Sequence, residues 1–193
     1  MTDFFALLDL PRRPWIDDEE LKAKYHAKAL QFHPDTSLDM DNGDAFAELN
    51  EAHQTLREPK RRLQHLLALE RPAARPVATE SIPSQIQQRF QRVSETTHLA
   101  GTAIEKARAT RNALTRGLVE AEILRARSEV SQLLEELRQL HDEADVEVRA
   151  LDLKWDRRTN NEVAETTRLQ LIFTYLGRWI AQLEETQFQL SQS

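Results

Sequence analysis

Three long stretches in the second half of the chain carry apolar residues at alternating spacings of three and four, over residues 86–107, 133–155 and 169–190. A stripe with this spacing covers one face of an α-helix, and three such stripes predict long helices packed nearly antiparallel. Only 4 of the 193 residues are glycine, which disfavours sheets that turn through tight hairpins. We therefore predict an all-α chain, with breaks between the long helices near Gly117 and within 156–161.

A proline-rich stretch divides the chain into two parts. Three prolines stand close together within residues 71–84, and this segment lacks helical periodicity, as is typical of a linker. The division predicts an N-terminal domain over 1–70 and a C-terminal domain over 85–193, both of ordinary domain size. The three stripes belong to the second part, which is therefore expected to be an antiparallel three-helix bundle or coiled coil.

The N-terminal part is predicted to hold four short helices. Asp3 can cap the first helix, and residues 17–20 form a D-x-x-E capping box at the start of the second. Pro34 disfavours helical geometry at His33, so the second helix should end there. A polar loop separates it from the third helix, and Pro59 is well placed near the start of the fourth.

Charge and residue counts exclude several classes of protein. The net charge is −6, from 26 basic and 32 acidic residues, whereas general nucleic-acid binders tend to be basic. The absence of cysteine excludes disulfides, thiolate metal sites and cysteine nucleophiles. No apolar run approaches the ~20 residues that span a bilayer, and the N-terminus has no basic leader segment. We expect a cytoplasmic protein with no membrane and no nucleic-acid partner.

The sequence also lacks the motifs of catalysis. It contains no glycine-rich phosphate loop, serine elbow or helical pair of catalytic carboxylates. The histidines outside the second helix and its loop have no mutual metal-ligand spacing. We therefore expect no enzyme activity, no cofactor and no metal site.

The tripeptide His33-Pro34-Asp35 stands in the loop between the second and third helices. With its surroundings over 25–35 and the third helix over 46–56, it resembles the J domain of DnaJ-type co-chaperones. The order of one short helix, two longer helices around this loop and one further short helix agrees with that resemblance. An ordinary helix stop is the alternative interpretation of the tripeptide, and its context argues against that.

One branch of the family matches better than the others. Residues 3–11 and 54–67 are similar to the HscB-type J proteins, and residues 181–185 resemble their last helix. HscB-type proteins place a three-helix bundle after the J domain, in agreement with the periodicity of the C-terminal part. The glycine-rich and cysteine-rich segments of DnaJ itself have no counterpart in this chain.

The resemblance implies docking on a DnaK- or HscA-family chaperone, whose ATP hydrolysis the J domain stimulates. A carboxylate at Asp35 can meet a basic group of the partner in a charge-assisted hydrogen bond, worth about 1.5–3 kcal/mol. Basic side chains on the second helix would steer association with an acidic surface, although a merely solvated helix face is the alternative. The predicted chaperone-binding residues are His33, Pro34, Asp35, Lys22, Lys24, His26 and Lys28.

HscB-type proteins also present a client, the scaffold on which iron–sulfur clusters are assembled, and bind it with an apolar patch on the bundle. By resemblance, the predicted client-binding residues are Ile86, Phe90, Val93, Ile172 and Phe173. The leucine- and methionine-rich motif of the family is missing there. The first three residues also suit the core of the bundle, and this interpretation is kept open.

A second hypothesis is a coiled-coil interaction or adaptor protein that has a J-like head and no iron–sulfur role. It rests on Ala27 and Thr36, which stand where the family usually has basic residues. Self-association is compatible with this hypothesis.

Overall fold

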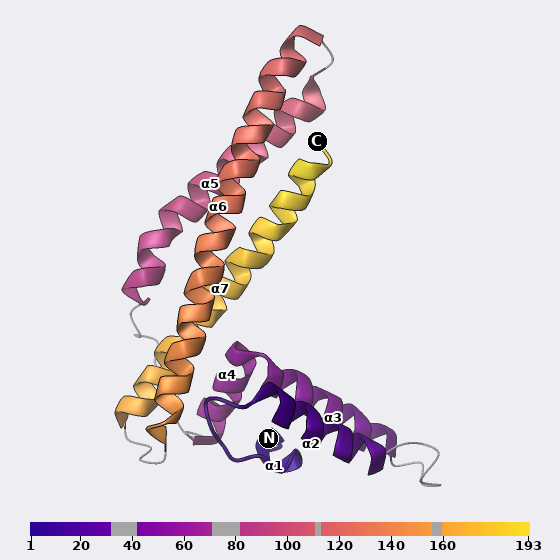
Figure 1. Cartoon of the computed structure of the whole chain (residues 1–193), viewed down its shortest axis with the longest axis vertical. Helices are drawn as coiled ribbons and strands as arrows, with labels where there is room; N and C mark the ends of the chain where they lie inside the picture. Colours follow the sequence, from indigo (N-terminus) through magenta and orange to yellow (C-terminus); the bar gives the residue numbers. More distant parts are fainter. Residues whose placement is uncertain (32–41, 71–81, 111–112, 156–159) are drawn as a thin grey trace. The chain divides into compact units, whose positions relative to one another are not determined.

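The computed structural model describes residues 1–31, 42–70, 82–110, 113–155 and 160–193 (Figure 1). These residues form seven α-helices and no strand, which confirms the all-α prediction. The helices are α1 (Phe4–Leu7), α2 (Asp18–Gln31), α3 (Asn42–Arg57), α4 (Pro59–Glu70), α5 (Ser84–Ala109), α6 (Ala113–Asp152) and α7 (Asn160–Ser191). No helix within the described residues is long and apolar enough to cross a membrane.

Two of the predicted helix starts are set by local capping. The Asp3 carboxylate accepts hydrogen bonds from the backbone N–H groups of Phe5 and Ala6, at 3.0 and 3.2 Å. The Asp17 carboxylate does the same for Glu19 and Glu20, at 3.1 and 3.0 Å. Each aspartate thereby satisfies donors that have no partner inside the helix, so Asp3 and Asp17 cap their helices as predicted.

The chain folds into two compact units, described here separately. The first comprises Met1–Glu80 with Asp145–Leu171, and the second comprises Ser81–Ala144 with Ile172–Ser193. The predicted division placed all of 85–193 in one domain. Contacts instead group the end of α6 and the start of α7 with the N-terminal helices. The predicted linker lies largely outside the described residues, and the boundaries at 70 and 85 stay a prediction.

The core of the first unit contains an unexpected tryptophan. Its buried members are Phe5, Leu8, Leu10, Ile16, Leu21, Leu49, Ala52, Leu56, Leu66 and Trp155. Trp155 continues the apolar stripe of α6 and was assigned by its spacing to the bundle. Its side chain is instead 1% exposed among side chains of the N-terminal helices, and its indole Nε1–H donates to the Arg12 carbonyl at 2.8 Å.

Polar contacts hold the end of α6 against the loop that precedes α2. The Arg13 guanidinium pairs with the Asp152 carboxylate at 3.2 Å, and the backbone N–H of Trp15 donates to the same carboxylate at 3.4 Å. The Arg149 guanidinium lies 5.2 Å from the centre of the Trp15 ring, within reach of a cation–π interaction. The end of α6 is therefore part of the fold of the first unit.

The second unit is a bundle of three long helices, with α6 antiparallel to both neighbours. Ion pairs Arg92–Glu136 and Lys106–Glu122 join α5 to α6. The residue number increases along α5 as it decreases along α6, which shows that the two helices are antiparallel. Contacts from α6 to α7 follow the same order, with Arg138 on Glu184, Ser131 on Gln187 and Arg127 on the Leu190 carbonyl. Exposed ion pairs of this kind contribute little stability, so the buried apolar stripes carry the packing.

One expected turn is misplaced. Gly117 lies inside α6 and not between the first two long helices of the bundle. A glycine costs a helix interior only about 1 kcal/mol, which a packed bundle tolerates, and this glycine has no positive φ. The connection from α5 to α6 instead spans the few residues between Ala109 and Ala113. The expected break within 156–161 agrees with the end of α6 at Asp152 and the start of α7 at Asn160, although residues 156–159 lie outside the described part.

Candidate functional site

The predicted docking tripeptide, His33-Pro34-Asp35, lies outside the described residues. The structure does describe the helices on either side of it, since α2 ends at Gln31 and α3 begins at Asn42. Side chains midway along these helices fix them together. The Tyr25 hydroxyl donates to the Asn50 side-chain carbonyl at 2.6 Å, and the Tyr25 and His53 rings stack with their centres 4.3 Å apart.

Two of the predicted basic residues lie beside α3. Lys22 and His26 line a groove between α2 and α3 together with His53 and Arg57. Burial lowers the pKa of His53, and the neighbouring charges of Arg57 and His26 lower it further. Asp18 and Glu19 line the same groove, and Lys22 approaches Glu19 at 3.9 Å. This edge of α2 therefore combines basic side chains with an acidic first turn.

The other two lysines lie on a different side of α2. The Lys28 ammonium pairs with the Asp9 carboxylate at 2.8 Å. The hydrogen bond from Lys28 lowers the pKa of Asp9, and the charges of Lys28 and Lys24 act in the same direction. Asp9 has a φ of 52°, a left-handed conformation that aspartate adopts more readily than most residues.

The four basic side chains of α2 do not all lie on one side of the helix. Residues 22 and 24 are separated by about 200° around a helix, as are residues 26 and 28. Lys22 and His26 therefore face the groove beside α3, whereas Lys24 and Lys28 face Asp9. Leu30, near the end of α2, is largely exposed and adds an apolar contact point toward the loop. Charge and apolar surface of this kind suit a protein partner.

A buried histidine anchors the N-terminal helix. The His65 Nε2 atom accepts a hydrogen bond from the backbone N–H of Phe4 at 3.1 Å, and its ring stacks on Phe4 with centres 4.6 Å apart. An imidazole that accepts at Nε2 has no proton there, so this contact requires neutral His65. Burial lowers the pKa of His65, and Arg12 lowers it further while Asp3 acts in the opposite direction.

Stability of the first unit is expected to fall as the pH drops below 6.5. The unfolded chain protonates its histidines near their ordinary pKa of 6.5, whereas folded His65 and His53 stay neutral to lower pH. Below pH 6.5 the unfolded state therefore binds more protons than the folded state. The free energy of unfolding is highest above pH 6.5 and decreases as the pH drops. It stops decreasing only below the pKa values of these histidines in the folded state. Urea unfolding at about pH 7.5 and about pH 5.5 measures the difference. The variant His65→Gln should reduce it, and an unchanged difference would contradict the assignment to His65.

Four of the five predicted client-binding residues are buried. Ile86, Val93, Ile172 and Phe173 belong to the apolar interior, and none is more than 5% exposed. Phe90 is the exception at 40% exposed, and its ring packs edge-on against Tyr175 and Trp179, with centres 5.4 and 5.0 Å away. The five residues therefore do not form one exposed patch. The core interpretation suits the buried four, and only Phe90 offers substantial surface.

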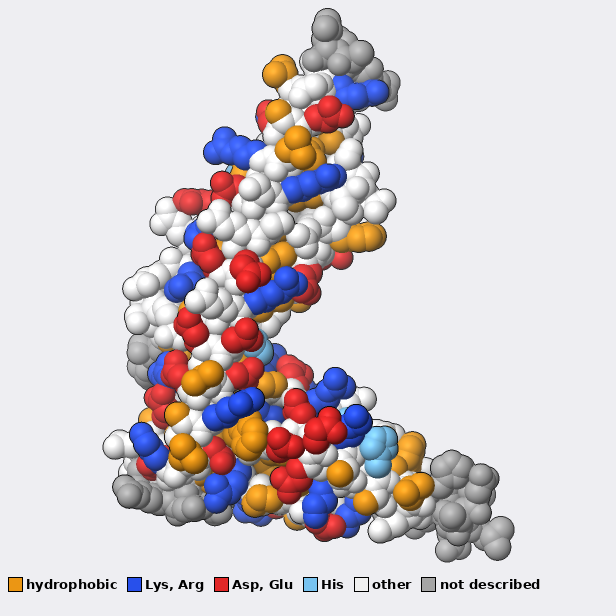
Figure 2. Space-filling model, viewed as in Figure 1, with side chains coloured by type: hydrophobic (Ala, Val, Ile, Leu, Met, Phe, Trp, Pro, Cys, Tyr) orange, Lys and Arg blue, Asp and Glu red, His pale blue; other side chains and the backbone are white. Residues whose placement is uncertain are grey.

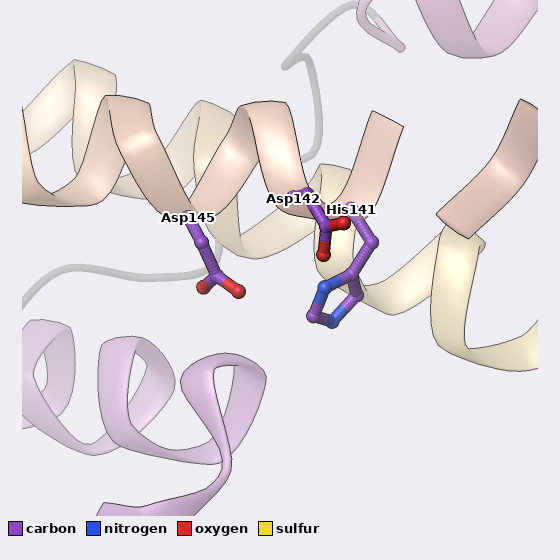
Figure 3. A group of neighbouring side chains, drawn as sticks. All are labelled: His141, Asp142 and Asp145. Carbon is purple, nitrogen blue, oxygen red and sulfur yellow. The ribbon is translucent and has the colours of Figure 1, made fainter. Parts of the chain in front are cut away.

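A further group of titratable side chains lies on α6. His141, Asp142 and Asp145 project to the same side of the helix, with one potential ligand atom of each within 4.8 Å of the others (Figure 3). The histidine ring packs edge-on against Phe173 at 5.0 Å, and the charge of Asp145 acts on buried Arg62. These contacts give His141 and Asp145 structural partners. Spacing between histidines gives no sign of this group, because its other two members are aspartates.

Comparisons with known proteins agree on the N-terminal part. The DnaJ domain family model matches residues 3–65. Over 73 residues the chain is 44% identical to the co-chaperone protein HscB homolog of Chromobacterium violaceum, a match that covers 35% of this chain and 42% of that protein. It is 41% identical over 62 residues to the chaperone protein DnaJ of Chelativorans sp., covering 32% of this chain and 16% of the relative. These matches span less than half of the curated relatives.

A solved structure extends the likeness to the whole fold. Chaperone HscB from Vibrio cholerae superimposes with a TM-score of 0.52 at 19% sequence identity, covering 98% of this chain and 99% of that one. Residues 3–65 therefore resemble a DnaJ domain, and the chain as a whole has the fold of HscB. The matched residues, called here the DnaJ-like region, include α1 to α3 and the first part of α4, and the tripeptide His33-Pro34-Asp35 falls between α2 and α3 in the sequence.

The DnaJ-like region also contains basic residues on α3 that the motif on α2 does not single out. His53 and Arg57 are four residues apart on α3, as Lys22 and His26 are on α2, so each pair lies along one edge of its helix. The two edges meet at the groove between the helices. The matched spacing was visible in the sequence, but only the packing of α2 on α3 brings the pairs together.

Proposed function

We propose that this protein is a co-chaperone that docks on a DnaK-family chaperone through the loop containing His33-Pro34-Asp35 and stimulates its ATP hydrolysis. The observation that carries the proposal is the DnaJ-like region itself, with this tripeptide between α2 and α3. The chemistry belongs to the partner, and this chain acts as its regulator. Basic side chains on both sides of α2, led by Lys22, Lys24, His26 and Lys28, support docking on an acidic surface.

The variant Asp35→Asn is expected to lose nearly all stimulation of ATP hydrolysis by a DnaK-family chaperone, measured in single-turnover reactions with the full chain. The substitution removes the charge that would form the docking hydrogen bond and leaves the side chain almost the same size. Glu51→Gln is the matched control, because Glu51 is exposed on α3 and the change removes the same charge. Circular dichroism checks that both variants are folded. Full stimulation by folded Asp35→Asn would refute the proposal.

We further propose that the client presented to the chaperone is an iron–sulfur cluster scaffold. The name of the Chromobacterium violaceum relative and the HscB fold support this extension. Since this chain has no cysteine, it would act through the scaffold and would not hold a cluster through thiolates of its own. Calorimetric titration of the full chain with such a scaffold protein tests the client separately, because Asp35→Asn should bind it as the wild type does.

The two measurements distinguish the proposed function from the adaptor hypothesis. Scaffold binding together with stimulation supports the complete proposal. Stimulation without scaffold binding would retain the co-chaperone and reject the iron–sulfur client. A chain that binds other proteins but stimulates no DnaK-family chaperone would be an adaptor with a J-like head.

A further inference from the structure

A groove with both apolar and polar lining residues lies near the connection between α5 and α6, in the second unit. It is lined by Ala107 on α5 and by Val119, Ile123 and Leu124 on α6. Leu124 is 63% exposed, an unusual position for a leucine in a helix that buries its apolar stripe. Figure 2 shows apolar and basic side chains next to each other near this end of the bundle.

The groove continues the face of α6 on which α7 packs. Ser131 contacts Gln187, and Arg127, one turn nearer the start of α6, binds the Leu190 carbonyl. Contacts with α7 therefore follow one face of α6 toward its start. The next positions on that face are Leu124 and Glu120, which line the groove together with Ser193. Because α7 packs on this face farther along α6, a helix lying in the groove would pack on α6 in the same manner.

The charge of this region differs from that of the rest of the chain. Residues 105–127 contain six basic and three acidic residues, a net charge of +3 in a chain of −6. Arg116 lines the groove, is exposed and makes no ion pair within the described residues. Arg127 also lines it and binds a neutral carbonyl, and with Glu120 as an acidic neighbour the lining holds two basic side chains and one acidic one.

We propose that this groove binds an acidic amphipathic helix of a partner protein. Leucine-like side chains of that helix would cover Val119, Ile123 and Leu124, and its carboxylates would meet Arg116 and Arg127. A second copy of this chain is a poorer occupant, because two such regions brought face to face would repel each other. The surface is separate from the DnaJ-like region, so the proposal does not depend on stimulation of a chaperone.

A synthetic peptide provides a direct test. The probe is a fluorescein-labelled helix with leucines at i, i+3, i+4 and i+7 and glutamates at most other positions, and the comparison peptide carries glutamine in place of glutamate. Fluorescence anisotropy with the full chain should show saturable binding of the acidic peptide, weakened by added salt. We expect Leu124→Glu and Arg116→Glu each to weaken binding by about tenfold or more, the effect of losing one anchor.

The matched control is Leu153→Glu, because Leu153 is also an exposed leucine, at 85%, and lies in the other unit. It should leave peptide binding unchanged. Equal affinity of wild type and Leu124→Glu, equal loss with Leu153→Glu, or equal binding of the glutamine peptide would each overturn the proposal. It would also be overturned if Leu124→Glu abolished a dimer seen in sedimentation, or if the chain bound anionic phospholipid vesicles through Leu124 and did not bind the peptide.

Discussion

Replacing Trp155 by alanine is expected to lower the free energy of unfolding of the first unit by about 3–5 kcal/mol, the cost of deleting a buried large aromatic side chain. Trp155 is 1% exposed in the core formed by α1 to α4. The substitution leaves a cavity among Phe5, Leu8 and their neighbours. It also leaves the Arg12 carbonyl without its indole donor. The effect should appear in helices more than eighty residues away in the sequence.

Hydrogen exchange of the full chain measures this effect, because it reports each helix separately. Peptides from α1 to α4 should lose protection in Trp155→Ala, while peptides from α5 should change little. Trp179→Ala is the matched control, since Trp179 is buried in the second unit and contacts Phe90 on α5. Trp179→Ala should reduce the protection of peptides from α5 and leave peptides from α1 to α4 nearly unchanged. Unchanged protection of α1 to α4 in Trp155→Ala would show that the DnaJ-like region does not depend on the end of α6.

Replacing Arg62 by methionine is expected to cost the first unit about 2–4 kcal/mol, because two buried acceptors lose their donor. Arg62 is 3% exposed, and its guanidinium donates to the carbonyls of Pro14 and Leu56, each at 2.8 Å. It thereby joins the loop before α2 to the end of α3. Burial lowers the pKa of this guanidinium, and the charges of Asp145, Asp18 and Asp152 oppose that shift.

Methionine is chosen because it nearly preserves the length and apolar packing of the arginine stem. Urea unfolding followed by circular dichroism gives the loss of stability. Arg57→Met is the control, because Arg57 is exposed at the end of α3 and should change stability by no more than about 0.5 kcal/mol. Arg62→Lys should recover only part of the loss, because a single ammonium does not reproduce the fork that reaches both carbonyls. Equal stabilities of Arg62→Met and Arg57→Met would rule out this role for Arg62.

Much of the fold follows from short-range patterns. Asp3 and Asp17 mark helix starts because a carboxylate in that position satisfies the free N–H groups of the first turn. The residues Leu133, Leu137 and Leu183 were assigned to the bundle core by spacing alone, and all are buried there. Both rules need only neighbours within about four residues. That is why they hold before any tertiary contact is known.

The candidate sites were less predictable. Helical spacing alone indicates that Lys22 and Lys24 point to different sides of α2, but only packing shows that one side meets α3 and the other meets Asp9. The same limit applies to Phe90 and Ile172. Both are apolar residues at helical spacing, yet one is partly exposed and the other is fully buried. An apolar residue at helical spacing gives the same sequence pattern whether it packs in the protein's own core or contacts a client.

Trp155 shows which properties of the chain follow from local sequence patterns and which depend on tertiary contacts. Local sequence patterns are enough to indicate that the chain is helical and where most helices begin, because caps and periodicity depend only on neighbouring residues. They also show that Trp155 is apolar and in step with the stripe of α6. Its place in the core of the first unit depends on tertiary contacts. Burial favours any apolar environment, and the choice among cores depends on shape and on partners such as the Arg12 carbonyl, which lies far away in the sequence.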